Sequence, residues 1–541
     1  MPFALGDSRV QNSFIGLIFG LSGYGKSVMI ANQILSLILS QKDFLPYLAL
    51  IDVGYGGLAV IEMLRYFLKD PDIAVGFDLH THGRIINPFD TPLGYRYPLG
   101  SHKAFLVNLL VSIVRQPGHT SEDFVDQVAM PLVDSVYRLR ADGVHGRPHL
   151  YVPGKNREID AAMQDIESDR KTTWWDVVDA LFAKGEVDLA MSAQCRAMPV
   201  LSDLIDVCNS DPVITSQFGD IKHPQLGIPI LKLIALAITQ AIDRWPMLAG
   251  TSDFSLSKAK LTAVNLEHAV KDRSTSGLKQ AGIMYLMARF LLTKDFLFHP
   301  LDAKSAPDAY RHYHEVRAEQ LFTAPKMGVY DELHNTNGLD AITNQLEKDA
   351  REWRKNNGIL LLASQMPQDF SDVLVGIATS IYILTNPYGP KDNPLVDKFS
   401  LTPDEAQIIS SYCVGAGAGG SGAFCIWRTK SGGTFKQLGY IMAPPAELWA
   451  YTTTPKDRQL RLYLTGKIGY MESLEILAQR YPDGSAMKDL ALRKKIEKIK
   501  EMQAMMAERD EDGMDPDVKS LGEELARLWN EFVLRDLRKA S

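Results

Sequence analysis

Cysteine is scarce in this sequence, and its few copies form no pattern. The four cysteines are Cys195, Cys208, Cys413 and Cys425. They make no CxxC pair and no cluster with histidine, so the sequence predicts neither a disulfide scaffold nor a zinc site. This usage favours a reducing compartment.

The sequence also lacks an excess of positive charge and a long apolar run. Its net charge is -7, which gives no general attraction for nucleic acid, although a local basic patch would be hidden in the average. The most apolar stretches, 228–242 and 283–292, are interrupted by charged or amide residues before the ~20 residues that a membrane span needs. No secretory leader is recognisable at the start. We expect a cytoplasmic protein with no membrane span of its own.

A series of short, continuous apolar runs is present instead. They lie at 14–19, 47–52, 261–266, 327–331, 359–364 and 381–385. Continuous rather than alternating runs are typical of strands covered on both faces by helices, as in a mostly parallel sheet. Between 101 and 249 helical periodicity dominates and strand patterns almost vanish. A chain of 541 residues is too long for one compact core, so we expect an α/β core with a helical insertion.

The segment Gly20 to Ser27 fits the pattern GxxxxGK[ST] and stands between a predicted strand and a predicted helix. Glycines at these positions let backbone N–H groups turn toward phosphates, and the helix start favours anions. We predict that Lys26 meets the β and γ phosphates of ATP and that Ser27 ligates Mg²⁺. The alternative is a chance glycine turn. The predicted nucleotide-contacting residues are Gly20, Ser22, Gly23, Tyr24, Gly25, Lys26, Ser27 and Val28.

Two later strand ends supply the groups that such a loop needs. Asp331 and Glu332 follow the run at 327–330, and we predict that Asp331 holds Mg²⁺ through water while Glu332 is the catalytic base. The alternative is an ordinary helix start or solvated turn. Gln365 follows the next strand and is interpreted as a γ-phosphate sensor, or else as a simple strand cap. Asp52 ends the second strand, with a functional role and a plain turn weighed equally.

These residues resemble the HerA/FtsK-clade ATPases, and more narrowly the large ATPase of type IV secretion and conjugation. The resemblance is carried by the loop, by Asp331-Glu332, and by the stretches 351–358, 363–370 and 447–455. The stretches 50–54 and 198–204 look most like the IcmB/DotO and TraU branch of type IVB systems. Members usually carry a domain ahead of the loop, so the chain looks like a C-terminal ATPase region or a naturally short form.

The resemblance implies a RecA-like core and a homo-hexamer with ATP between subunits. The expected units are residues 1–95 and 256–470 for the core, 96–255 for an all-helical insertion and 471–541 for a helical tail. The implied partners are other secretion-system ATPases and inner-membrane components, with the chain peripheral at a bacterial inner membrane. Two rival functions stay open: a DNA-translocating or coupling ATPase, for which nucleic-acid binding is undecided, and an assembly scaffold with little turnover.

Phosphoryl transfer gains from an arginine at the γ-phosphate, often supplied by a neighbouring subunit. Arg354 lies in a basic cluster before the Gln365 strand, and Arg428 ends a later strand. Each is a candidate for this catalytic role in trans, and the alternative for each is a solvated cation. Among the remaining features, the glycine-rich run 415–422 is expected to be a loop, and His334 is interpreted as a surface histidine.

Overall fold

The computed structural model describes residues 14–41, 44–115, 124–166, 168–224, 226–389, 393–417, 420–501 and 514–540. Its centre is a ten-stranded sheet in these described residues, with the order β10-β9-β7-β1-β6-β5-β2-β4-β3 and with β8 paired to β9. The strands are β1 (Ile15–Phe19), β2 (Tyr47–Asp52), β3 (Ala74–Asp78), β4 (Leu261–Asn265), β5 (Lys326–Tyr330), β6 (Gly358–Ser364), β7 (Ser380–Ile383), β8 (Ala416–Gly417), β9 (Gly420–Arg428) and β10 (Thr434–Ile441). The expected α/β class is thus confirmed.

The strands from β7 to β3 in this order run parallel, and only the hairpin β9–β10 and the short β8 run antiparallel. Parallel strands bring their carboxyl ends to one edge of the sheet, where ligands bind in such folds. The strand β6 lies between β1 and β5, so Gln365 follows a strand that separates the glycine loop from Asp331 and Glu332. This order places the glycine loop, Gln365 and the acidic pair at the ends of three adjacent strands, β1, β6 and β5.

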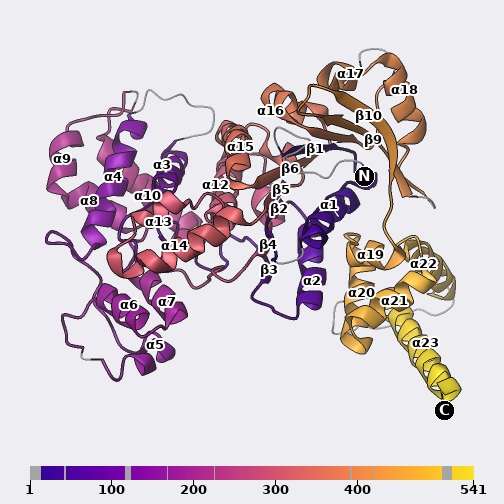
Figure 1. Ribbon diagram of the computed structural model, residues 1–541, viewed down its shortest axis with the longest axis horizontal. Helices are drawn as coiled ribbons and strands as arrows, with labels where there is room; N and C mark the ends of the chain where they lie inside the picture. Colours follow the sequence, from indigo (N-terminus) through magenta and orange to yellow (C-terminus); the bar gives the residue numbers. More distant parts are fainter. Residues whose placement is uncertain are drawn as a thin grey trace.

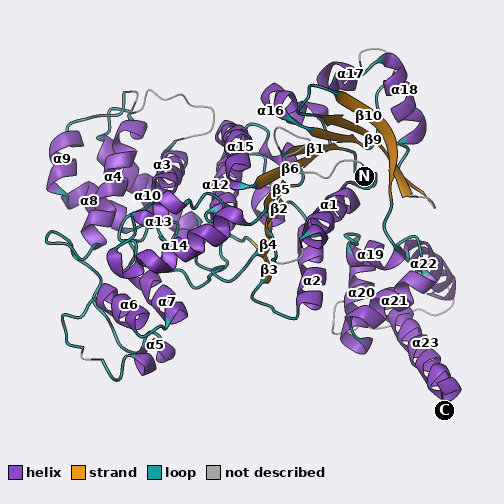
Figure 2. Ribbon diagram, viewed as in Figure 1, coloured by secondary structure: helices purple, strands orange, loops and turns teal. Residues whose placement is uncertain are grey.

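Helices cover both faces of the sheet and form two further bodies (Figures 1 and 2). Those close to the sheet are α1 (Lys26–Ser40), α2 (Gly56–Leu68), α11 (Glu267–Val270), α12 (Thr275–Thr293), α15 (Asp340–Glu352), α16 (Asp372–Ile377), α17 (Pro394–Phe399) and α18 (Pro403–Tyr412). The helices α13 (Pro300–Lys304) and α14 (Asp308–Thr323) lie among the helices of the first further body (Figure 1). Short 3₁₀ turns, η1 (Pro246–Leu248), η2 (Leu333–Thr336), η3 (Trp353–Asn356) and η4 (Pro367–Asp369), join some of them.

The first of these bodies lies between β3 and β4 in the sequence. It contains α3 (Gly100–Val114), α4 (Val125–Arg140), α5 (Arg157–Ala162), α6 (Trp174–Ala183), α7 (Val187–Ala197), α8 (Asp203–Ser210), α9 (Pro212–Phe218) and α10 (Ile230–Arg244). Across the described part of 79–260 there is no strand beyond two isolated bridges. A helical composition was expected for this segment.

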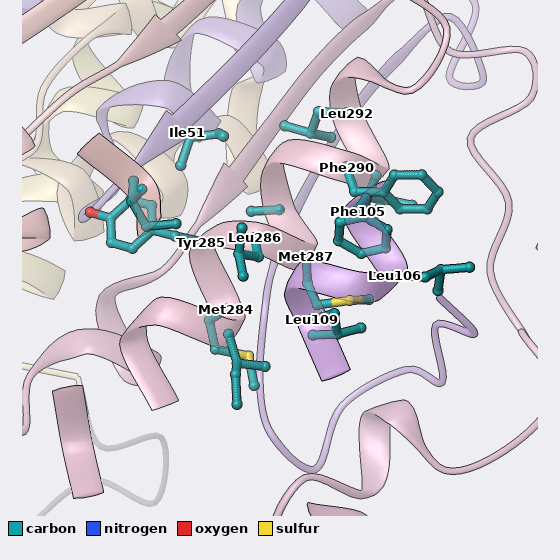
Figure 3. Packing of buried hydrophobic residues seen from close by; sticks show 14 of the residues in the cluster. Ile51, Phe105, Leu106, Leu109, Met284, Tyr285, Leu286, Met287, Phe290 and Leu292 are labelled. Carbon is teal, nitrogen blue, oxygen red and sulfur yellow. The ribbon is translucent and has the colours of Figure 1, made fainter. Parts of the chain in front are cut away.

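This helical body shares its core with the sheet rather than enclosing one of its own. One continuous cluster of buried side chains runs from Phe19 and Ile51 of the sheet through α12 into α3 and beyond. Phe105 of α3 stacks on Phe290 of α12 with ring centroids 4.0 Å apart and an interplanar angle of 3° (Figure 3). Such offset or stacked aromatic pairs add to the burial of apolar area. The helix α12 therefore packs on the sheet with one side and on the helical body with the other.

The second body is C-terminal and holds α19 (Pro445–Ala450), α20 (Pro455–Ile468), α21 (Tyr470–Arg480), α22 (Met487–Glu501) and α23 (Pro516–Ala540). It lies beside α2 (Figure 1). In α23, Leu525 is buried and Leu528 is 36% exposed. None of the described helices combines the length and apolarity that a membrane crossing requires.

Two local expectations need correction. The strand β3 was not predicted, since Gly76 interrupts its apolar pattern; a Cβ there would stand 2.9 Å from Leu58 of α2, so glycine permits close packing of α2 on β3. The glycine-rich run 415–422 is not simply a loop. Its described residues include β8 and the start of β9, because antiparallel pairing with β10 extends β9 back to Ser421 and pairing with β8 extends it to Gly420.

Candidate functional site

The glycine loop between β1 and α1 forms one wall of the candidate site. Gly20 N–H donates to the carbonyl of Ser364 at 3.1 Å, which fixes the loop start on β6. Gly23 and Gly25 have φ of 83° and 88°, a left-handed conformation that glycine adopts without strain. Ser22 is exposed, Tyr24 and Val28 are half-buried, and Lys26 opens α1. The loop has the turn and the helix start that a phosphate requires.

Lys26 is the cation at the centre of the site. Its side chain is 5% exposed, and Nζ lies 2.5 Å from Glu332 Oε1 and 3.0 Å from Asp331 Oδ1. Burial lowers the pKa of Lys26, but the charges of Asp331 and Glu332 outweigh it and the pKa is raised. The ammonium group therefore stays charged and is held directly by the two carboxylates.

Glu332 is held in a strained position with three polar partners. Its φ is 57°, uncommon for a non-glycine residue and a feature that clusters at functional sites. Gln365 Nε2 donates to Glu332 Oε2 at 2.6 Å, and His334 Nδ1 lies 3.1 Å from the same oxygen. Burial raises the pKa of Glu332, but His334, Lys26 and Gln365 together lower it to about 2. The carboxylate is ionised at neutral pH.

His334 is therefore a partner of Glu332, and 31% of its side chain is still exposed. Its backbone N–H also donates to Ser364 Oγ at 3.1 Å, and Ser364 Oγ donates to Asp369. The sequence signal was its position two residues after Glu332, on the turn η2 that returns it to the carboxylate. A functional histidine at this spacing depends on the positive φ of Glu332, which no sequence pattern indicates.

Asp331 and Asp52 make up the carboxylate side of the site. Both are buried, with 7% and 4% of their surface exposed. Burial and the neighbouring charge of Asp331 raise the pKa of Asp52 to about 7, and burial likewise raises the pKa of Asp331. Asp52 Oδ2 also accepts from Gly57 N–H at 2.8 Å. Asp52 therefore holds the turn into α2, and it lies close enough to Asp331 for the two charges to interact.

The donor set suits a hard cation. Ser27 Oγ and Asp52 Oδ2 both border the space above the Cα of Gly56, at 3.9 Å and 3.2 Å from the point where a Cβ would stand. Asp331 contributes a buried carboxylate, and Mg²⁺ at nucleotide sites takes only one or two protein oxygens besides phosphate and water. No group of three metal-binding side chains occurs in the described part of the chain. Hydroxyl and carboxylate oxygens fit Mg²⁺ but not a thiolate-preferring metal.

The two arginine candidates lie at the other edge of the sheet. Arg354 is exposed on η3, which precedes β6, and Arg428 ends β9, which is antiparallel to β7. The guanidinium of Arg428 donates to the carbonyls of Val375 at 2.6 Å and Ala378 at 3.1 Å, and burial lowers its pKa. Neither cation lies near Lys26 of its own chain, so a role for either would need a second subunit.

The hairpin at the antiparallel edge also contacts the loop, which sequence reasoning missed. Ser421 Oγ donates to the carbonyl of Tyr24 at 2.9 Å. A Cβ on Gly25 would stand 3.3 Å from Ser421 Cβ, and one on Gly415 would stand 3.7 Å from the Tyr24 ring. These contacts follow from strand register across about 400 residues, for which the sequence carries no local signal. The glycine-rich run supports the loop.

Loop, strand ends and carboxylates together have the form of a phosphate-binding loop with acidic partners at the carboxyl edge of a parallel sheet. No protein-family model matches the chain, and no curated protein sequence matches it. Among solved structures it is similar to the structure of VirB4 of Thermoanaerobacter pseudethanolicus, with 14% sequence identity and a TM-score of 0.47. That likeness covers 81% of this chain and 91% of the other. At this level it adds no weight to what the site itself shows.

Proposed function

We propose that this protein binds Mg-ATP at the loop Gly20–Ser27 and hydrolyses it with Glu332 as catalytic base. The carrying observation is the charged cluster in which Lys26 contacts both Asp331 and Glu332 while Gln365 holds the second oxygen of Glu332. Three strand ends meet there: the loop after β1 contributes the cation for phosphate, the end of β5 contributes one carboxylate for the metal and one for water, and the end of β6 contributes the amide of Gln365.

The chemistry follows from competition for Lys26. The β and γ phosphates of ATP would compete with the carboxylates for its ammonium group, because phosphate oxygens are strong charge-assisted acceptors. Losing that contact moves the pKa of Glu332 up from about 2 and leaves one of its oxygens available to a water. Glu332 then accepts a proton from the attacking water, while Gln365 and His334 orient the carboxylate. Base strength thus increases when substrate is bound.

Ser27 and Asp331 would hold Mg²⁺, Asp331 through water. The ion supplies charge neutralisation on the phosphates. Asp52 lies next to this pair and accepts a hydrogen bond from Gly57 N–H. That bond keeps the turn into α2 beside Ser27.

The test is to separate binding from turnover. Glu332→Gln should bind ATP with near-unchanged affinity and lose ~10²–10⁴-fold in turnover, as expected for removal of a general base. Nucleotide binding is measured with a fluorescent ATP analogue and turnover by phosphate release. Glu315→Gln, on the exposed surface of α14, is the matched control and should behave as wild type. Wild-type turnover in Glu332→Gln would show that another group is the base.

We further propose, on the sequence resemblance, that hydrolysis powers a type IV secretion or conjugation machine of type IVB character. The chain would act as a homo-hexamer at the cytoplasmic side of a bacterial inner membrane, with other ATPases of the machine as partners. Electron microscopy of the purified chain with and without ATP tests the ring. DNA-stimulated, salt-sensitive turnover would instead favour a translocating ATPase, and nucleotide binding without turnover would favour a scaffold.

An arginine acting in trans is part of this proposal, and Arg354 is the better candidate because it is exposed and has no hydrogen bond to backbone carbonyls, unlike Arg428. Chains carrying Lys26→Ala and chains carrying Arg354→Ala should each be nearly inactive alone, since such an arginine is worth ~10³–10⁵-fold. Mixed rings contain junctions with both groups intact and should regain activity. The pair Lys26→Ala with Arg428→Ala is the comparison. Mixed rings that form but stay inactive would remove Arg354 from the site.

A further inference from the structure

The stretch 447–455, noted in the sequence for its resemblance alone, lies next to the candidate metal site. It is anchored by Trp449, which is fully buried and donates its Nε1–H to the carbonyl of Tyr481 at 2.9 Å. From that anchor the chain passes through Thr452, 8% exposed, and Thr453, which is exposed, before α20 begins. Trp449 therefore fixes the stretch to the C-terminal body, while Thr453 lies on the surface of that body.

Gly56, the first residue of α2, shows where Thr453 stands. Around the point where a Cβ on Gly56 would lie, the neighbours are Asp52 Oδ2 at 3.2 Å, Thr453 Cγ2 at 3.7 Å and Ser27 Oγ at 3.9 Å. Three segments far apart in sequence thus meet over one glycine. The C-terminal body reaches the side of the loop on which Ser27 presents its hydroxyl.

A second contact joins the C-terminal body to the same region, through Arg458 in the first turn of α20. The guanidinium carbon of Arg458 lies 3.1 Å from the centroid of the Tyr55 ring, and Tyr55 is the residue just before Gly56. Tyr55 Oη donates to Glu62 Oε2 at 3.2 Å, and the fully buried Arg461 donates to the same oxygen at 2.9 Å. The helix α20 therefore clamps the first two turns of α2.

We propose that Thr453 and Arg458 are positioning residues of the magnesium side of the nucleotide site: they press the turn from Asp52 to Gly57 against Ser27. This inference rests on the proposed function. Within the turn, Gly54 N–H donates to Asn265 Oδ1 at 2.9 Å and Gly57 N–H donates to Asp52 Oδ2 at 2.8 Å. Gly56 has no side chain that could contact Ser27, so the side of the turn that faces Ser27 is held by what packs on it from α20. Without the clamp, Asp52 and Ser27 keep their chemistry but lose a fixed separation, which weakens binding of a cation with strict octahedral geometry.

The test measures turnover against Mg²⁺ concentration at saturating ATP, with nucleotide affinity measured separately in EDTA. Arg458→Ala, Tyr55→Ala and Thr453→Ala should each raise the Mg²⁺ midpoint by ~10–100-fold, the range for partners behind metal ligands. Affinity for ATP in EDTA should change less than twofold. Tyr55→Phe keeps the stacked ring and should stay close to wild type. Thr454→Val is the control, because Thr454 is exposed and its side chain makes no capping hydrogen bond.

A double-substitution cycle distinguishes positioning from general loosening. Arg458→Ala and Tyr55→Ala together should shift the midpoint no more than either alone, because both remove one contact. An unchanged midpoint in folded Arg458→Ala and Thr453→Ala would overturn the inference, and so would equal losses of affinity with and without Mg²⁺. If Arg458→Ala does not fold, Thr453→Ala and Tyr55→Ala still decide it. A wild-type chain that binds no nucleotide would instead overturn the proposed function.

Discussion

Two buried regions of this protein are built on opposite principles. At the carboxyl edge of the sheet, Lys26, Asp331 and Glu332 are charged groups whose burial is offset by contact with one another. Between α3 and α12, His102, Phe105 and Phe290 are stacked neutral rings. The first region depends on electrostatic balance and the second on shape. Substitutions of similar size should therefore have different signatures, in pH dependence and nucleotide binding for one and in stability alone for the other.

Breaking the charged cluster should have the largest effect. Lys26→Met leaves Asp331 and Glu332 buried without a cation, at a cost of ~3–5 kcal/mol in stability, and it should also abolish measurable ATP binding. The folded-state pKa values of both carboxylates then rise, so the folded protein takes up protons more readily and becomes more stable as pH falls from 8 to 6. Thermal unfolding at both pH values checks this. An unchanged melting temperature at pH 8 would contradict the balance described here.

Breaking the aromatic stack should lower the free energy of unfolding as much as Lys26→Met does, but it should leave ATP binding unchanged. Phe290→Ala removes a ring that stacks on Phe105 at 4.0 Å and should destabilise the protein by ~3–5 kcal/mol. The loss should be the same at pH 6 and pH 8, and the KM for ATP of the folded fraction should not move. Phe67→Ala, a 58% exposed phenylalanine on α2, is the matched control. A pH-dependent loss in Phe290→Ala would show that the two regions are coupled.

His102 gives the neutral region a single, predictable pH dependence. Burial lowers its pKa to about 4, although its Nε2 lies 2.7 Å from the carbonyl of Pro88. Between pH 6.5 and 4 the unfolded chain binds a proton that folded His102 does not, so stability falls as pH falls through that window, by up to ~3 kcal/mol. Between pH 7 and pH 4.5 the free energy of unfolding should therefore fall more in the wild type than in His102→Phe, which lacks the histidine. A constant difference would show that His102 stays neutral in both states or charges in both.

The smallest effect on stability is expected from loss of a single buried hydrogen bond in the neutral region, the one made by Tyr137. Tyr137 is fully buried and donates its hydroxyl to the carbonyl of Phe89 at 2.6 Å. Tyr137→Phe keeps the ring and removes that bond, for a loss of ~1 kcal/mol, with turnover unchanged. Chemical denaturation measures it. A loss above ~3 kcal/mol would mean that the hydroxyl belongs to a wider network.

The shared core on α12 also determines what deletion of the helical segment 101–249 would do to the protein. The sequence predicts a helical insertion at 96–255, because strand patterns almost vanish between 101 and 249. In the structure its side chains continue the core on α12, where Met284, Met287 and Phe290 face Phe105 and Leu109 (Figure 3). Deletion would expose that face, so loss of solubility is the expected first result. ATP binding by such a deletion variant is informative only after the exposed face is made polar.

The loop and the strands were predictable from sequence because their signals are local. The pattern from Gly20 to Ser27 and the apolar runs before Asp331 and Gln365 each lie within one strand and its following turn. Parallel strands then bring those ends together, which places Lys26, Glu332 and Gln365 in contact. Ser421 and Thr453 could not be predicted, because their proximity to the loop depends on pairing direction and helix docking across hundreds of residues. His334 was missed because its geometry depends on the backbone strain at Glu332.

The place where the helical segment interrupts the sheet has an evolutionary consequence. The chain leaves the sheet after β3 and returns as β4, the two strands at the end of the sheet farthest from the glycine loop's neighbours β7 and β6. Segments of any length can be exchanged there without altering the strands beside β1, β5 or β6. Such exchange is limited only by the apolar face of α12, which every replacement must cover. A different segment at this position would leave the candidate nucleotide site unchanged, because no strand that carries one of its residues borders the point of insertion except β2, which ends at Asp52.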